Sequence, residues 1–222
     1  MKVVIIAAMD REYESLCNLL GGERGGRGGH EFILVQGGIG KVNAACTCTE
    51  LILREHPDCI ISSGCAGGLR PDIKVMDTVV GSQYCYHDVW CGEPNAVGQV
   101  QGLPARFDAD PSLIALARTV GNGRGDTHKG LICSGDRFCT DQEEISAIAG
   151  AFPQALAVDM ESCAMAQVCH LYDVPFLSVR VISDSVSADG RKGEYDNFWA
   201  EVSDSSFGFV SRLLDSLPSQ IR

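Results

Sequence analysis

Short apolar runs alternate with amphipathic segments along most of the chain. The runs rich in β-branched residues are predicted to be strands, at Val3–Ala8, Phe32–Gln36, Cys59–Ser63, Asp77–Ser82, Lys129–Ser134, Ala155–Val158 and Phe176–Ile182. Segments with apolar residues at helical spacing are predicted to be helices, at Asp10–Leu20, Lys41–Glu55, Asp141–Ala149, Met160–Tyr172 and Tyr195–Ser216. This alternation predicts an α/β fold in which a mainly parallel or mixed sheet carries helices on both faces.

No stretch of the sequence has the composition of an interdomain linker. Residues 1–222 are therefore expected to form a single domain, long enough to bury a substantial core. The glycine-rich stretch from Gly21 to Gly29 separates a predicted helix from a predicted strand, and we expect it to be a flexible surface turn.

The formal net charge of −11 argues against a nucleic acid or an anionic membrane as partner. No apolar run approaches the length needed to span a bilayer. The apolar run Met1–Ala8 leads into an acidic segment that begins at Asp10, without the cleavage pattern of a signal peptide. We therefore expect a cytoplasmic protein.

The cysteines add one further expectation. There are eleven, an odd number, and none forms a Cys-x-x-Cys pair. Several stand where alanine or valine would serve, as in Ala45-Cys46 and Val168-Cys169, and a free cysteine behaves as a small buried hydrophobe. We expect reduced structural thiols and no metal site.

Asp184 is the first candidate for chemistry. It ends the apolar run that begins at Phe176, a run typical of a buried central strand. Open α/β sheets bind their ligands at the carboxyl ends of strands, where a partly buried carboxyl group can hold a proton near neutral pH and donate it. Taken alone, Asp184 is equally compatible with the N-cap of a following helix.

Polar or glycine-rich segments also follow other predicted strands, at Ala8–Glu12, Gly37–Lys41, Ser63–Leu69 and Val158–Ser162. A parallel sheet would bring these segments together at one edge, where the glycine loops could bind an anion through backbone N–H groups. Taken singly, each glycine loop is also explained as a tight turn. Glu161 is then an acidic residue in a first helical turn, and Glu12 a solvated helix residue.

Several motifs occur together along the chain, namely Ile5–Glu12, Gly38–Val42, Ser63–Leu69, Tyr86–Asp88, Leu131–Asp136, Phe152–Ala155, Val158–Glu161 and Val179–Asp184. Their types and order resemble the nucleoside phosphorylase and nucleosidase superfamily, and within it the 5′-methylthioadenosine/S-adenosylhomocysteine nucleosidases. The resemblance runs nearly end to end. It implies a three-layer α/β/α sandwich around a mixed sheet, and a homodimer that acts on a small nucleoside.

The resemblance also implies roles for three carboxyl groups in hydrolysis of the bond between adenine and ribose. Asp184 matches the acid that protonates adenine N7. Glu12 matches the carboxylate that positions and activates water, and Glu161 matches the residue that binds the ribose hydroxyls. Such a bond breaks through an oxocarbenium-like state, for which one protonated and one ionised carboxyl group on opposite sides of the sugar are suited.

The same resemblance assigns supporting roles. Met160 packs against the sugar and Phe138 stacks on the base. The backbone around Cys139 reads the N1/N6 edge of adenine, and Ser183 orients the catalytic acid. No metal or redox cofactor is required. The other positions expected to contact the substrate are Met9, Ile39, Cys65, Ala66, Gly67, Tyr195 and Phe198.

Some positions depart from the usual family pattern. Cys65 stands where serine or threonine is usual, and Asp159 replaces a usual glutamate. The segment Asp88–Asn95 aligns poorly with the loop through which a partner subunit covers the 5′ group. We expect Trp90 to anchor a dimer interface there, with a core tryptophan as the alternative. The sequence does not determine the 5′ substituent of the substrate. It is compatible with a role in methionine salvage and with one in quorum-signal metabolism.

Other functions are also compatible with parts of the pattern. A phosphorylase would need cations near the nucleophile, for which Lys41 and Arg70 are candidates, although Glu12 would repel phosphate. A futalosine-type nucleosidase would cleave a purine nucleoside with a bulky aromatic 5′ group. A non-catalytic nucleoside-binding protein would need neither an acid nor a water-activating base.

Overall fold

The computed structural model of the protein describes residues 1–120, 125–186, 191–202 and 204–221. Its strands are β1 (Lys2–Ala7), β2 (Arg24–Arg27), β3 (His30–Gln36), β4 (Cys59–Gly68), β5 (Thr78–Tyr86), β6 (Phe107–Asp108), β7 (Thr127–Ser134), β8 (Ala155–Asp159) and β9 (Phe176–Asp184). Its helices are α1 (Asp10–Leu20), α2 (Lys41–Glu55), α3 (Pro111–Ala117), α4 (Gln142–Ala151), α5 (Ser162–Tyr172), α6 (Arg191–Glu201), the 3₁₀ helix η1 (Asp204–Phe207) and α7 (Gly208–Ser216).

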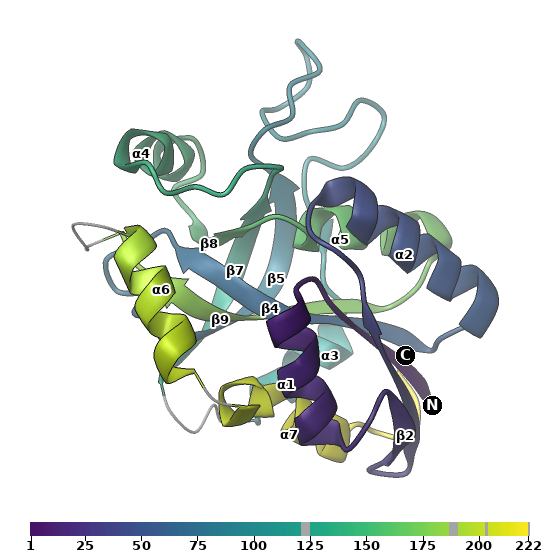
Figure 1. The fold of residues 1–222 in the computed structure, drawn as a ribbon. Coiled ribbons are helices and arrows are strands. Elements are labelled where there is room, and N and C mark those ends of the chain that lie inside the picture. The colour runs from purple at the N-terminus through teal and green to yellow at the C-terminus, as the bar shows by residue number, and fades with distance from the viewer. Residues whose placement is uncertain (121–124, 187–190, 203, 222) are drawn as a thin grey trace.

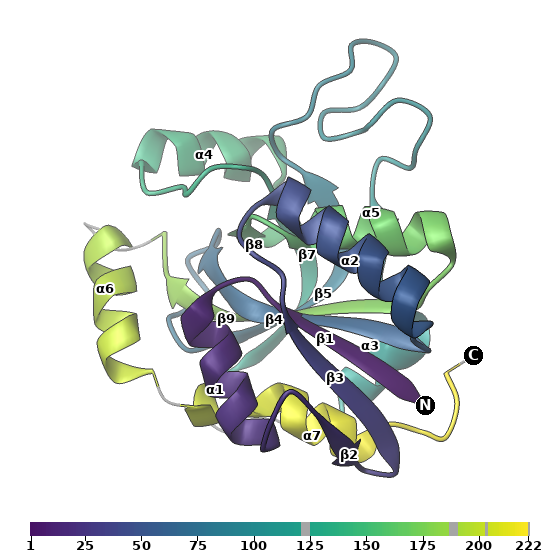
Figure 2. The ribbon, with the colours of Figure 1, turned by 45° about the vertical axis from the view of Figure 1, so that its right-hand side comes forward.

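The strands form one mixed sheet between two layers of helices. Helices α2 and α5 cover one face, and α1, α3 and α7 cover the other (Figures 1 and 2). The apolar strands are buried on both faces, as β1 and β9 illustrate, which explains their continuous runs of β-branched residues. The predicted three-layer α/β/α fold is confirmed.

The described strands belong to a nine-stranded sheet in the order β2-β3-β1-β4-β8-β7-β5-β6, with β9 paired to both β4 and β5. Strand β9 runs parallel to β4 and antiparallel to β5. The pairings from β4 through β8, β7, β5 and β9 therefore return to β4. This part of the sheet closes into a ring, which brings the ends of several strands close together.

The predicted parallel alignment holds for β3, β1, β4 and β9, whose carboxyl ends lie at one edge of the sheet, but β8 joins them in a different way. Strand β8 is antiparallel to β4, and the two pair only where Gly67 faces Val158 and Gly68 faces Ala157. They come together because β4 continues to Gly68, beyond its predicted end at Ser63. Their carboxyl ends thus cross at one point, and the polar segments after both strands meet there.

The expectation of a flexible turn at Gly21–Gly29 was wrong. Residues Arg24–Arg27 form edge strand β2, which pairs antiparallel with β3. The hairpin turns at Gly28 and Gly29, whose φ angles of 58° and 83° suit glycine. Because β2 consists of glycine and arginine, it carries no apolar alternation that would predict a strand.

The predicted helix Tyr195–Ser216 was also wrong in extent. Helices α6 and α7 are separate, and the 3₁₀ turn η1 lies between them. The serine and aspartate side chains at this break compete for backbone hydrogen bonds, which disfavours a continuous helix.

Helix α3 was not predicted, although Asp110 caps it by accepting hydrogen bonds from the N–H groups of Ser112 and Leu113. None of the described helices is both long and apolar enough to cross a membrane.

Candidate active site

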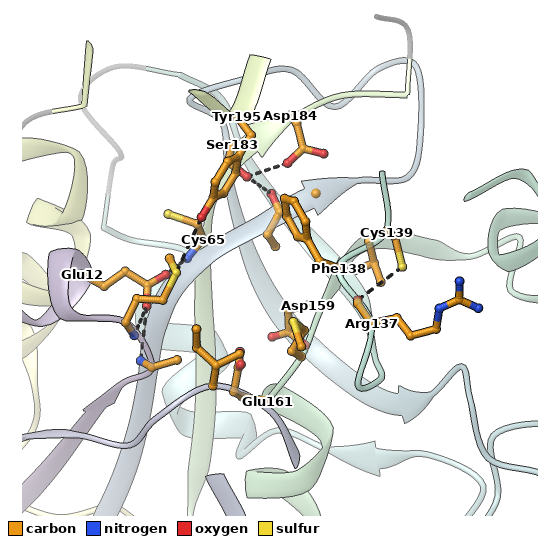
Figure 3. A pocket seen from close by; sticks show the side chains of 17 residues that line it. Glu12, Cys65, Arg137, Phe138, Cys139, Asp159, Glu161, Ser183, Asp184 and Tyr195 are labelled. Carbon is orange, nitrogen blue, oxygen red and sulfur yellow. Dashed lines mark hydrogen bonds between the residues drawn. The ribbon is translucent and has the colours of Figure 1, made fainter. Parts of the chain in front are cut away.

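A cavity of about 310 Å³ lies where the carboxyl ends of β4, β8 and β9 meet (Figure 3). Each polar or glycine-rich segment identified in the sequence contributes to its wall. The lining residues are Ala8, Met9, Glu12, Ile39, Cys65, Ala66, Gly67, Arg137, Phe138, Cys139, Val158, Asp159, Met160, Glu161, Ser183, Asp184 and Tyr195.

Glu12 is buried in the first turn of α1, with only 3% of its surface exposed. Its Oε2 accepts hydrogen bonds from the N–H groups of Ala8 (3.2 Å) and Met9 (3.0 Å), and its Oε1 accepts one from Cys65 (2.7 Å). Burial raises the pKa of Glu12, while Arg180 and the backbone donors act against that rise. The interpretation of Glu12 as a solvated helix residue is therefore wrong.

The local sequence explains how Glu12 reaches this position. As the third residue of α1 it reaches back to the N–H of Met9, the N-cap, as in a capping box. Strand β4 passes close to it because position 64 is glycine. A Cβ on Gly64 would lie 2.8 Å from Glu12 Oε1. The glycine-rich end of β4 thus provides room for the carboxylate.

Glu161 lies between β8 and α5 and is buried. It precedes α5 as the N-cap, but its side chain does not cap the helix. Instead Oε1 accepts a hydrogen bond of 2.9 Å from the N–H of Gly40, whose φ of 91° suits glycine. Burial, reinforced by the nearby carboxylate of Asp159, raises the pKa of Glu161 to about 7.

Asp184 is the last residue of β9 and is buried. The hydroxyl of Ser183 donates a hydrogen bond to Asp184 Oδ1 at 2.7 Å, and it also lies 3.3 Å from the carbonyl oxygen of Ala66. Glu12, Glu161 and Asp184 lie at separate points around the cavity (Figure 3). A ligand of nucleoside size in the cavity would therefore meet a different carboxyl group on each of three sides.

A buried ion pair joins Asp159, in the cavity wall, to Arg180 behind it. Arg180, on β9, donates from Nε to Asp159 Oδ2 at 2.8 Å and from a terminal nitrogen to the Ser62 hydroxyl at 2.9 Å. Asp159 also accepts hydrogen bonds from the hydroxyls of Ser134 and Ser162. The charge of Arg180 also favours the ionised forms of Glu12 and Glu161. Because both ions are paired and hydrogen-bonded, the structure accommodates their burial.

Aromatic and sulfur side chains also line the cavity. Phe138 is half exposed at its rim, and its ring lies 5.0 Å from that of Tyr195 in an edge-to-face arrangement. The thiol of Cys139 is 3.6 Å from the carbonyl oxygen of Arg137. The phenol of Tyr195 is 3.6 Å from the sulfur of Met9. A flat apolar ring could enter between these groups and the carboxyl groups.

A family model described as the Phosphorylase superfamily matches residues 2–215. The chain belongs to this superfamily. A relative from Bacillus thuringiensis (strain Al Hakam), named 5′-methylthioadenosine/S-adenosylhomocysteine nucleosidase, is 36% identical over 231 residues, which cover 98% of this chain and 100% of the relative. The resemblance indicated by the sequence motifs is confirmed.

Solved structures of superfamily members have the same fold. The S-adenosylhomocysteine nucleosidase of Streptococcus pyogenes, in complex with 5-methylthiotubericidin, aligns with a TM-score of 0.89 at 34% identity and covers 98% of each chain. A futalosine hydrolase mutant from Helicobacter pylori strain 26695 aligns with a TM-score of 0.89 at 28% identity, covering 98% of this chain and 100% of that one.

The structure places the expected site residues at this cavity, with one exception. Phe198 is buried against Trp199 and does not line it, because it faces the core from α6. The sequence analysis did not assign Arg137 to the site, and it gave no individual role there to Ala8, Val158 or Asp159. It also missed Arg180, although a charged residue within a buried apolar strand signals a buried partner.

The cations considered for phosphate binding lie outside the cavity wall. The Lys41 ammonium is 2.7 Å from Asp88, and Arg70 forms two hydrogen bonds with Asp72, at 2.9 and 3.0 Å. Away from the cavity, Asp77, Asp126 and His128 place potential metal-binding atoms within 4.8 Å of one another. The Asp77 carboxylate there already accepts hydrogen bonds from Lys74, Asp126 and His128, so this group is explained as a structural turn.

Proposed function

We propose that the protein is an N-glycosidase that hydrolyses 5′-methylthioadenosine and S-adenosylhomocysteine, with release of adenine. Its full-length similarity to nucleosidases of that name supports the proposal. So do the three buried carboxyl groups on separate sides of one cavity (Figure 3). Hydrolysis of an N-glycosidic bond needs an acid for the leaving base, a group that activates water, and contacts to the sugar.

The base is proposed to lie between Phe138 and Asp184. Phe138 offers an exposed aromatic face at the rim for stacking, and the backbone around Cys139 is close enough to contribute to base recognition. Asp184, oriented by the Ser183 hydroxyl, would donate its proton to adenine N7. Protonation makes adenine a better leaving group, and a positioned acid contributes roughly 10²–10⁴-fold to the rate.

The ribose is proposed to lie against Met160 and Glu161. The hydrogen bond from Gly40 fixes one oxygen of Glu161, so the carboxylate is held in place to accept hydrogen bonds from the sugar hydroxyls. These contacts orient the anomeric carbon toward Glu12, on another side of the cavity. Glu12 would then position water and take up its proton.

The environment of Glu12 favours water over phosphate, and this observation carries the assignment of a hydrolase. Three backbone N–H groups, from Ala8, Met9 and Cys65, converge as they would around an anion. The carboxylate of Glu12 already occupies that position. A phosphate dianion beside ionised Glu12 would be repelled by roughly 4 kcal/mol per charge pair at about 4 Å and an effective dielectric near 20.

The homodimer is likewise proposed, and an exposed apolar surface supports it. Ile39 in the loop before α2, Val42 on α2, and Trp90 and Val97 in the loop after β5 are all at least half exposed. The 2.7 Å ion pair of Lys41 with Asp88 ties the beginning of that loop to α2. Exposed apolar side chains on two segments joined in this way suit an interface with a second copy. The exposure of Trp90 contradicts its alternative interpretation as a core residue.

A single domain and a cytoplasmic location complete the proposal. Strand β1, near the N-terminus, and helix α7, near the C-terminus, contribute to the same hydrophobic core. All eleven cysteines are free thiols, as is usual in a reducing compartment. The shared core is consistent with one nucleosidase domain over residues 1–222, and the free thiols are consistent with a cytoplasmic location.

Release of the base tests the proposed function. Methylthioadenosine, S-adenosylhomocysteine, adenosine, inosine and futalosine are each incubated with the enzyme, with and without phosphate. We expect adenine from the first two substrates at rates that phosphate does not change. Preferential cleavage of futalosine would support the activity of the Helicobacter pylori relative instead. Binding without release from any substrate would indicate a nucleoside-binding protein.

A further inference from the structure

The backbone that follows Asp184 is held by a side chain from helix α6. Ser185, which is buried, directly follows Asp184. Its N–H donates a hydrogen bond of 2.7 Å to Oε2 of Glu194, and its hydroxyl donates to the same oxygen at 3.2 Å. Glu194 lies in the first turn of α6, nine residues further along the chain. One carboxylate oxygen thus accepts two hydrogen bonds from the residue next to the proposed acid.

Pairing within the sheet does not by itself hold the backbone at this point. The register between β9 and β4 shifts just before Asp184, which pairs with Gly67 and is the last residue of β9. The N–H of Ser185 therefore lies beyond the strand and needs an acceptor from elsewhere, because a buried backbone donor is costly to leave unpaired. Glu194 supplies that acceptor. A hydrogen bond to a carboxylate is roughly twice as strong as one between neutral groups.

The contact also joins two parts of the cavity wall. Asp184 lines the cavity at one end of the contact, and Tyr195, which follows Glu194, lines it at the other. The ring of Tyr195 lies 5.0 Å from that of Phe138, against which the base is proposed to stack. The Ser183 hydroxyl holds the acid from the residue before it. The position of Asp184 relative to the base thus depends on the neighbours that precede and follow it in the chain.

The position of Asp184 is critical because it must transfer a proton. An acid donates efficiently only when it lies within hydrogen-bond reach of the atom that receives the proton, and a small displacement lowers the rate. Glu194 is not among the described residues that line the cavity. Its effect on the reaction would therefore pass through the backbone next to Asp184.

We propose that Glu194 is a positioning residue for the general acid. By holding the N–H of Ser185, it keeps Asp184 within hydrogen-bond reach of N7 of the bound base. The proposal rests on the nucleosidase function proposed above and adds to it a residue outside the cavity wall. The alternative is that an acidic residue in a first helical turn only interacts with the helix dipole, which would affect stability and not proton transfer.

A double-mutant cycle tests whether Glu194 acts through Asp184. Glu194→Ala should lower kcat for methylthioadenosine about tenfold, the effect of one hydrogen bond to a charged group, and change KM by less than about twofold. In the Asp184→Asn background, which has no acidic proton to donate, the same substitution should change kcat by less than about twofold. Glu194→Gln keeps an oxygen acceptor and should recover most of the rate. Glu201→Ala, exposed at the other end of α6, is the matched control and should leave kcat unchanged.

A substrate whose leaving group needs no proton gives an independent measurement. The 4-nitrophenyl β-glycoside of 5-methylthioribose releases 4-nitrophenolate, a stable anion that departs without help from an acid. For this substrate kcat of Glu194→Ala should stay within about twofold of the wild-type value, since general acid catalysis contributes little to such a leaving group.

Three results would overturn the positioning role even if the wild-type enzyme is an active nucleosidase. They are an equal loss of kcat from Glu194→Ala in the wild-type and Asp184→Asn backgrounds, an equal loss for the two substrates, and no loss at all. A lower free energy of unfolding without a lower kcat would likewise overturn it and assign the contact to stability. Failure of the wild-type enzyme to release adenine would instead contradict the proposed function, and the positioning role with it.

Discussion

Among single residues, Asp184 is expected to have the largest effect on catalysis. Asp184→Asn keeps the shape of the side chain and its hydrogen bond from Ser183 but removes the acidic proton. We expect kcat to fall by at least about 10², or roughly 3 kcal/mol of transition-state stabilisation, while the free energy of unfolding changes little. Steady-state kinetics and denaturant unfolding measure the two quantities.

Asp108→Asn is a matched control for that substitution, because Asp108 is exposed on β6 and hydrogen-bonds Gln83. Its kcat should equal that of the wild type. An active Asp184→Asn enzyme would remove Asp184 from the role of general acid.

Glu161 makes stability depend on pH in a defined direction. Its pKa is about 7 in the folded protein, against the ordinary value of 4.5. Between these values the folded state binds more protons than the unfolded state, so stability falls as pH rises through this range and then levels off. This difference corresponds to about 3 kcal/mol. Glu161→Gln removes it, so the variant should gain stability relative to the wild type as pH rises from about 5 to 8.

Denaturant unfolding of both proteins at several pH values measures this effect. Glu143→Gln, on the exposed side of α4, should show no comparable gain. If the free energies of unfolding of Glu161→Gln and the wild type differed by the same amount at every pH, burial would not raise the pKa of Glu161.

At the level of elements, the start of α2 is expected to position Glu161. Asp136, just after β7, accepts the N–H of Lys41 at 2.7 Å, and the neighbouring Gly40 N–H binds Glu161. Asp136→Ala should loosen this loop and lower kcat/KM by roughly tenfold, the effect of one charge-assisted hydrogen bond. The discrimination against a 2′-deoxy substrate should shrink in parallel, because that preference depends on Glu161.

Two further variants separate positioning from general stability. Asp136→Asn retains an oxygen acceptor and should recover most of the activity. Asp110→Ala removes the N-cap of α3, far from the cavity, and should cost about 1 kcal/mol of stability with no change in kcat/KM. Equal kinetic effects of Asp136→Ala and Asp110→Ala would contradict the positioning role.

The elements also show where sequence patterns succeed and fail. The central strands were predictable, because strands buried on both faces are continuous apolar runs. Edge strand β2 and the last residues of β4 consist largely of glycine and polar residues, which are also typical of turns. Their strand conformation depends on pairing with β3, β8 and β9, and this is not visible in the local sequence.

For the whole molecule, the closed ring of β4, β8, β7, β5 and β9 explains why the site was only partly predictable. The segments at the ends of the parallel strands could be recognised from the sequence, whereas the position of the segment after β8 depends on an antiparallel crossing of β4 and β8. Arg180 was missed for the same reason, since its partner Asp159 lies on another strand. The roles of individual residues came from the family resemblance rather than from spacing.

The dimer is a prediction for the whole molecule. Trp90 and Leu171 are exposed to similar extents, 58% and 59%, but only Trp90 lies in the loop that the Lys41–Asp88 ion pair ties to the start of α2. Trp90→Ala should weaken a dimer that the wild-type protein forms at micromolar concentration, and Leu171→Ala, at the end of α5, should not. Sedimentation velocity measures this. A wild-type monomer that is fully active at these concentrations would contradict the dimer.

Product analysis in phosphate buffer tests the central claim most directly. Because Glu12 occupies the position where an anion would bind, water is expected to attack the anomeric carbon of methylthioadenosine. The products should then be adenine and free 5-methylthioribose, in equal amounts and at a rate independent of phosphate. Formation of 5-methylthioribose 1-phosphate as the main product would contradict the account and identify the enzyme as a phosphorylase.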